Sequence, residues 1–136
     1  MRLFFVLAPA LFPLIASATS VFLAAMLFVA GAMMLTTSVG LRLTLEGFGS
    51  GATGLILTCQ AIGFVVGTQI GPALIRRVGH IRVFSALASL ASISILFHGV
   101  YIEAWLWWLM RVVTGISFAG FYVVTESWLN DRASNE

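Results

Sequence analysis

The feature that most constrains this chain is the length of its uncharged apolar runs. Residues 3–41, 47–75 and 83–102 contain no charged side chain. A helix needs about 20 consecutive apolar residues to cross the roughly 30 Å hydrocarbon core of a bilayer, and each run is long enough. Only 9% of the 136 residues are charged, against roughly 25% in a soluble domain. The sequence therefore predicts an integral membrane protein whose apolar surface is in contact with the lipid bilayer.

From these three runs and a fourth apolar stretch that contains only Arg111 as a charged residue, we predict an all-α membrane protein of about four transmembrane helices. The expected spans are residues 14–41, 52–74, 83–102 and 104–125, and together they make residues 1–136 a single transmembrane domain. The third and fourth spans form a hairpin with almost no loop between them. The second and third are joined by a short basic turn.

The beginning of the first span allows two interpretations. Residues 1–20 resemble a signal-like extension, with Arg2, an apolar core and an Ala16-Ser17-Ala18 cleavage pattern. Alternatively, they belong to a long first helix, although Pro9 and Pro13 weaken its early part. We favour the long helix, because a membrane-spanning stretch follows immediately.

The arginines predict how the chain is oriented. Five of the seven fall on one side of a four-span topology: Arg2, Arg76, Arg77, Arg82 and Arg132. Only Arg42 falls on the other side. Because cytoplasmic loops carry an excess of basic residues, we expect both termini in the cytoplasm and a multi-pass protein of the inner (plasma) membrane.

Aromatic residues agree with this orientation. They gather at the outer hairpin and at the inner end of the fourth span: Tyr101, Trp105, Trp107, Trp108 and Trp128. Such belts occur at both membrane–water interfaces. We therefore expect the three tryptophans of the hairpin to lie at the outer interface.

Three glycines in the second span are spaced four residues apart. Gly63, Gly67 and Gly71 share one helix face, and small residues at this spacing let another helix approach closely. This pattern is typical of plain helix packing. It also suits a seam along which two helices slide during a conformational cycle, and the sequence does not separate the two interpretations.

Arg111 lies about seven residues into the fourth span, with Gly115 and Ala119 on the same helix face. An arginine near the bilayer centre costs about 2.5–3.5 kcal/mol on insertion scales, and such charges face a cavity or a partner. The alternative is that its side chain extends to the outer interface. We favour a functional role. Gln60, in the second span, either lines a polar route or bonds to another helix.

Glu126 ends the fourth span at the predicted depth of the arginine cluster. We expect a charge pair between Glu126 and Arg76, Arg77 or Arg82. At an exposed interface such a pair contributes about 0–1 kcal/mol, but it can bias one conformation over another.

No pattern of catalysis is visible. His80 and His98 fall at opposite ends of the third span, without the neighbours of a catalytic triad or a metal site. The single cysteine, Cys59, permits no internal disulfide and suits a small packing residue. We therefore predict no enzymatic activity, no cofactor, no metal and no nucleic-acid partner.

Two segments resemble the major facilitator superfamily of transporters. Residues 67–82, GTQIGPALIRRVGHIR, resemble its signature between helices two and three, with Gly79 as the central glycine. Residues 111–120, RVVTGISFAG, resemble its fourth-helix motif. The flanking segments 42–48 and 126–130 are most similar to the YcaD-like bacterial carriers. The resemblance implies part of the N-terminal six-helix half of that fold and transport of a small solute.

The segment departs from the family pattern at Pro72, Arg76 and His80, where a glycine, an acidic residue and a basic residue are usual. In the family the acidic residue helps to lock the two halves together, so a lock here must differ. The resemblance also suggests a part in proton coupling for Arg111. Because such carriers have two six-helix halves, we expect a truncated carrier that needs its remainder or self-association.

Two other functions compete with the carrier. A four-helix exporter of the small multidrug type, acting as a dimer, normally carries a glutamate in its first helix, and residues 14–41 contain no acid. A membrane subunit that does not transport is the other alternative.

Overall fold

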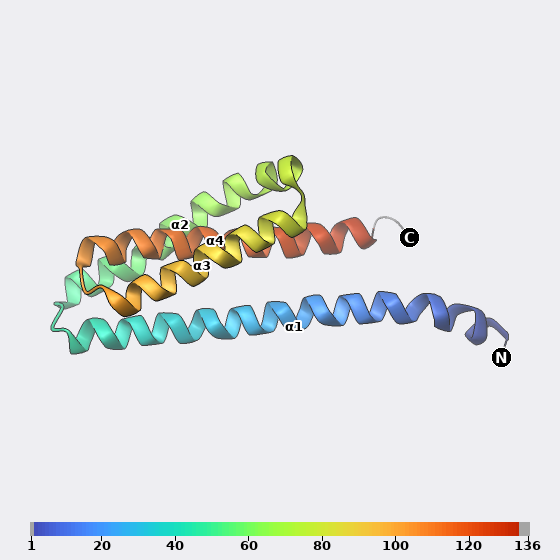
Figure 1. Cartoon of the computed structure of the whole chain (residues 1–136), viewed down its shortest axis with the longest axis horizontal. Helices are drawn as coiled ribbons and strands as arrows, with labels where there is room; N and C mark the ends of the chain where they lie inside the picture. The colour runs from blue at the N-terminus through green and yellow to red at the C-terminus, as the bar shows by residue number, and fades with distance from the viewer. Residues whose placement is uncertain (1, 134–136) are drawn as a thin grey trace. The chain divides into compact units, whose positions relative to one another are not determined.

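The computed structural model describes the backbone of residues 2–133 and the side chains of residues 19–20 and 22–131. The described backbone forms four helices and no strand (Figure 1): α1 (Arg2–Leu45), α2 (Ser50–Val78), α3 (His80–Val100) and α4 (Ala104–Ala133). Each contains a stretch long and apolar enough to cross a membrane. The predicted all-α, multi-pass membrane fold is thus confirmed.

The chain divides into two compact units, residues 1–33 and 34–136. α1 begins in the first unit and ends in the second as one continuous helix. The backbone is helical through Pro9 and Pro13, as the interpretation of a long first helix expects. A proline inside a helix removes one N–H donor and crowds the carbonyl one turn earlier, and transmembrane helices tolerate this where other groups satisfy the freed carbonyl.

The helices extend further than the predicted spans except at the end of α3, which stops at Val100 rather than at residue 102. α1 ends at Leu45 rather than at residue 41, α2 runs to Val78, and α4 remains helical to Ala133. Hydropathy detects the part of a helix that matches the hydrocarbon core, whereas its hydrogen bonds continue into the polar region. The ends of α2 and α4 therefore carry their charged residues on helical turns.

The basic turn between α2 and α3 is a single residue, Gly79. Its φ of 87° lies in the region that glycine adopts without steric cost. Its N–H also bonds the carbonyl oxygen of Ile75 at 2.9 Å, which closes the C-terminus of α2. Arg76 and Arg77 form the last turn of α2, where positive charge is favourable for the helix dipole.

Within the second unit α4 packs against both α2 and α3, whereas α2 and α3 contact each other little. Two groups of buried apolar residues hold these contacts. One contains Leu43, Ile56 and Trp107, towards the α3–α4 turn. The other contains Val83 and Leu87, packed near the α2–α3 turn.

The three glycines of α2 face α4, and the two helices diverge along them. A Cβ at Gly63 would collide with the backbone carbonyl of Val112, and one at Gly67 would lie 2.7 Å from the carbonyl oxygen of Ile116. At Gly71 the nearest atom is a side-chain carbon of Val123 at 3.3 Å. Backbone contact thus gives way to side-chain contact, and α2 separates from α4 towards Gly79.

The expectation that all three tryptophans of the α3–α4 hairpin lie at the interface is wrong for Trp107. Trp105 and Trp108 are exposed, but Trp107 is completely buried. The reason is helical geometry, because positions 105 and 108 share one face and 107 lies on the face of Arg111. The Trp107 ring stacks on Phe48 with 6.0 Å between centroids, and its indole N–H donates to the Tyr101 carbonyl at 2.6 Å.

Candidate functional site

Arg111 lies at the centre of the candidate site, with no exposed surface. Its Nη1 donates to Oε1 of Gln60 on α2 at 2.5 Å, and a longer contact of 3.5 Å reaches Oγ1 of Thr36 on α1. All three residues belong to the second unit. The side chain therefore points into the helical bundle and is bonded there, rather than extending to the outer interface.

Gly115 brings Gln60 to Arg111. It follows Arg111 by one helical turn, and a Cβ there would collide with the backbone carbonyl of Gln60 and approach the Phe64 nitrogen at 2.8 Å. Gly63 makes the matching close contact from α2. Because both residues lack a side chain, the two backbones touch at this level, and the short Gln60 amide spans the gap to the guanidinium.

The Arg111 guanidinium is only partly satisfied. Nε and Nη2 are buried and have no hydrogen-bond partner among the described residues. Within the same part of the chain no carboxylate pairs with Arg111; the ion pairs found there are Arg42–Glu46 and His80–Asp131. A buried cation with unpaired N–H groups is energetically costly. A ligand that accepts hydrogen bonds from Nε and Nη2 would remove this cost, so we take Arg111 as the centre of the candidate site.

A second polar group lies one turn nearer the α3–α4 turn, around Trp107. His98 of α3 is 4% exposed, and its ring centroid lies 5.6 Å from that of Trp107. Its Nδ1 bonds the Ser94 carbonyl oxygen at 2.6 Å, while its Nε2 is buried with no partner among the described residues. The sequence predicts no role for His98, because a lone histidine in an apolar span belongs to no recognisable motif.

Arg42 fixes this end of the bundle. Its Nη1 donates to the carbonyl oxygens of His98 at 3.2 Å and Gly99 at 2.9 Å, which are among the unpaired acceptors at the C-terminus of α3. Its guanidinium carbon also lies 6.0 Å from the centroid of the Trp107 ring. From the sequence, Arg42 indicated the topology and belonged to a family-like segment. In the structure its side chain also connects α1 to α3.

At the other end the predicted pairing of Glu126 is wrong within the described residues. No ion pair joins it to Arg76, Arg77 or Arg82, all of which are exposed. The connection to α4 is made instead by His80, whose Nε2 lies 2.9 Å from Oγ of Ser127 and 3.6 Å from Asp131. The divergence of α2 from α4 separates Arg76 from Glu126.

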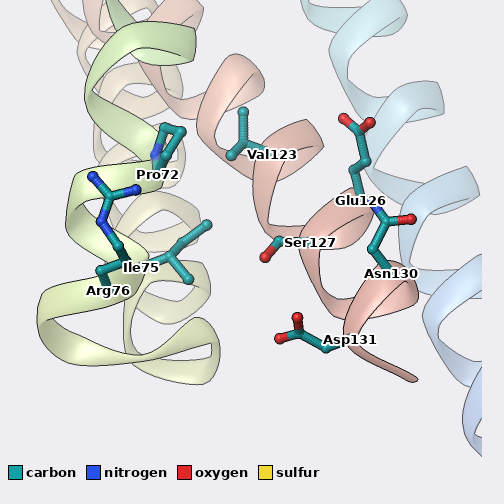
Figure 2. A pocket seen from close by; sticks show the side chains of 8 residues that line it. All are labelled: Pro72, Ile75, Arg76, Val123, Glu126, Ser127, Asn130 and Asp131. Carbon is teal, nitrogen blue, oxygen red and sulfur yellow. The ribbon is translucent and has the colours of Figure 1, made fainter. Parts of the chain in front are cut away.

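A pocket of about 300 Å³ opens where α2 and α4 separate. Figure 2 shows Ile75, Ser127 and Asp131 directed into the gap, with Arg76 and Glu126 on opposite sides of it. Pro72 lines the pocket on α2. The acidic and basic residues of the motif regions thus share a pocket rather than a salt bridge.

These features define an α-helical, multi-pass membrane protein with a buried, partly unsatisfied arginine in its interior. Comparison with protein-family models, with curated proteins and with solved structures finds no match to this chain.

Proposed function

We propose that this chain is part of a secondary carrier that moves a small solute across a membrane. The observation that supports this best is Arg111, a completely buried guanidinium with two unpartnered nitrogens in a four-helix apolar bundle. Charged residues are rare within membrane spans, and where they occur they mark substrate or ion pathways. A helix bundle that served only as an anchor would have no need of this group.

The depth of Arg111 agrees with a transport site. It lies seven residues from Ala104, the start of α4, which is about 10 Å at the helical rise of 1.5 Å per residue. With Ala104 taken at the edge of a 30 Å hydrocarbon core, Arg111 would lie roughly a third of the way across, about 5 Å from the midplane. Solute sites of secondary carriers lie near the midplane, between structural repeats.

The order of the motifs supports the major facilitator architecture as the form of this carrier. The glycine-rich α2, the one-residue basic turn at Gly79 and the α4 arginine with Gly115 follow one another as in that superfamily. Under this proposal the chain supplies part of the N-terminal six-helix half. The remaining helices come from further sequence or from self-association, because four helices do not enclose a site that opens alternately to two sides.

The close contact of α2 and α4 supports movement as well as packing. Helices that meet through glycine present few side chains to one another, so one can shift against the other without repacking large groups. Gly63 and Gly115 lie beside the Arg111–Gln60 bond. A shift along this contact would therefore alter the polar centre directly, which a carrier requires for coupling.

The first test is to sequence the source genome beyond codon 136. A reading frame that continues through about eight further apolar segments supports the carrier, and the whole frame is then used for transport. Purified protein in liposomes is screened for saturable uptake of radiolabelled sugars, organic cations and organic acids. We expect uptake of one class, its loss in Arg111→Gln, and its retention in Glu103→Gln, which removes a charge of opposite sign from the exposed α3–α4 turn.

Two outcomes would overturn the proposal. One is a reading frame that ends at residue 136, together with no uptake above empty liposomes for any solute class. The other is uptake that Arg111→Gln leaves unchanged while Glu103→Gln behaves in the same way, because the buried arginine would then have no part in transport.

A further inference from the structure

The two unpartnered nitrogens of Arg111 lie on the same edge of its guanidinium group. Nη1 makes the contacts to Gln60 and Thr36, whereas Nε and Nη2 have no partner among the described residues. In a guanidinium group Nε and Nη2 present two parallel N–H bonds. That pair of donors matches the two oxygens of a carboxylate, which it binds in a bidentate manner.

We infer that the Nε–Nη2 edge of Arg111 binds the carboxylate of a small anionic solute. This inference rests on the proposed carrier function and adds the chemical class of its substrate. Gln60 holds the opposite side of the guanidinium, and this bond fixes the direction in which the free edge points. The solute carboxylate neutralises the buried charge and satisfies both remaining donors.

The acids in the part of the chain that the structure describes are badly placed to provide that carboxylate. Glu46 is within 3.6 Å of Arg42, and Glu103 lies in the turn before α4. Glu126 is 15 residues beyond Arg111 on the same helix, about 22 Å along its axis. In a second copy packed parallel or antiparallel, these residues would also lie at helix ends, about 10 Å or more along the helix axis from the level of Arg111. A mobile solute reaches that level without placing a protein acid there.

The surroundings favour a carboxylate bound away from water. Thr114 and Ser117, the buried hydroxyls nearest Arg111 along α4, donate to carbonyl oxygens of their own helix, so they do not compete for the guanidinium. Arg111 is completely enclosed in this conformation. Entry of a solute therefore requires α4 to move against a neighbouring helix, and the α2–α4 glycine contact lies directly beside the site.

Trp107 provides a reporter for the experiment, because it is buried and one helical turn from Arg111. Trp105→Phe, Trp108→Phe and Trp128→Phe leave it as the only tryptophan. The full chain in detergent is titrated with sodium formate and sodium acetate against sodium chloride at equal ionic strength. We expect a saturable change of Trp107 emission with the carboxylates alone. Arg111→Lys, which keeps the charge and loses the two-nitrogen edge, should raise the half-saturation concentration at least about tenfold.

Arg111→Gln should abolish the response, and Arg82→Lys, an exposed arginine on α3, should leave it unchanged. Circular dichroism establishes that each variant is folded; if Arg111→Gln is not, Arg111→Lys carries the test. No saturable response in the parent, or an equal response in Arg111→Lys, overturns the inference. The two proposals fail separately: uptake of a neutral solute without carboxylate binding removes this inference alone, whereas carboxylate binding without any uptake removes only the carrier.

Discussion

The side chain of Gln60 accepts a 2.5 Å hydrogen bond from Arg111, and this bond joins α2 to α4 at the point where their backbones touch. It is the shortest contact of the Arg111 side chain, and Thr36 adds a weaker one at 3.5 Å. The backbone contact between α2 and α4 and the Arg111–Gln60 hydrogen bond therefore depend on each other. Replacing either partner should affect both the stability of the bundle and the orientation of the guanidinium.

Gln60→Leu should destabilise the protein by about 1–3 kcal/mol, because it leaves a third nitrogen of a buried guanidinium without a strong acceptor. Unfolding by a denaturing detergent, followed by circular dichroism, measures the change. Gln69→Leu is the control, since Gln69 is an exposed glutamine on the same helix. The double variant Gln60→Leu/Arg111→Leu should lose less than the sum of the single changes. Equal stabilities for the two glutamine variants would show that the bond contributes nothing.

Gly63→Ala should destabilise the contact between α2 and α4 by about 1–3 kcal/mol, because the new methyl group forces two backbones apart. Gly71→Ala should have a smaller effect, since its Cβ meets only a Val123 side-chain carbon at 3.3 Å. Gly54→Ala has no atom within 4 Å of the added carbon. It should stabilise α2 by up to about 1 kcal/mol through helix propensity. Thermal melting of the three variants tests this order, and a Gly63→Ala protein as stable as Gly54→Ala would contradict it.

Arg42→Gln should lower stability by about 1 kcal/mol, because the C-terminal carbonyls of α3 lose a charged donor at a partly exposed position. Arg42→Lys should recover part of the loss, since an ammonium group also bonds carbonyl oxygens. Arg82→Gln removes an exposed arginine from α3 and should change stability little. Melting temperatures in detergent provide the measurement. If Arg42→Gln and Arg82→Gln melt together, the connection from α1 to α3 has no energetic role.

Trp107→Phe should cost about 1–3 kcal/mol, because the Tyr101 carbonyl loses the indole donor and the smaller ring leaves space in the core. Trp105→Phe should be nearly neutral, since Trp105 is 63% exposed. Fluorescence provides an independent check: the emission lost in Trp107→Phe should be protected from acrylamide, and that lost in Trp105→Phe should be quenched. The opposite pattern would place Trp107 in the outer aromatic belt.

The orientation of the chain is tested by labelling single cysteines in a Cys59→Ala background. A membrane-impermeant maleimide should label Arg77→Cys only from the cytoplasmic side, because basic residues are retained there. Glu103→Cys, in the turn between α3 and α4, should be labelled only from outside. Reversed labelling of the two positions would invert the topology and remove the basis for the major facilitator proposal.

The sequence by itself determined the class of fold. Three uncharged runs of about 20 residues or more, and a fourth apolar stretch interrupted only by Arg111, are typical of membrane-spanning helices rather than of a small soluble domain. The four helices, their order and their short connections therefore follow from the apolar pattern along the chain. The sequence also predicts the glycine face of α2, because residues spaced four apart lie on the same side of a helix and small residues there allow another helix to approach closely. The spacing does not predict which helix packs on that face, since a glycine-lined surface can pack against many different apolar helices.

Only the tertiary structure decided which partners the polar residues have. Arg111 bonds Gln60, 51 positions away. Glu126 lines a pocket and is not paired with Arg76, because α2 diverges from α4 between Gly71 and Gly79. Trp107 is buried while its neighbours are exposed, a distinction that depends on which face of α4 meets the bundle. Hydropathy depends only on which residues follow one another along the chain. Which polar side chains meet depends on the rotation and separation of whole helices, and these are set by packing between residues far apart in the sequence.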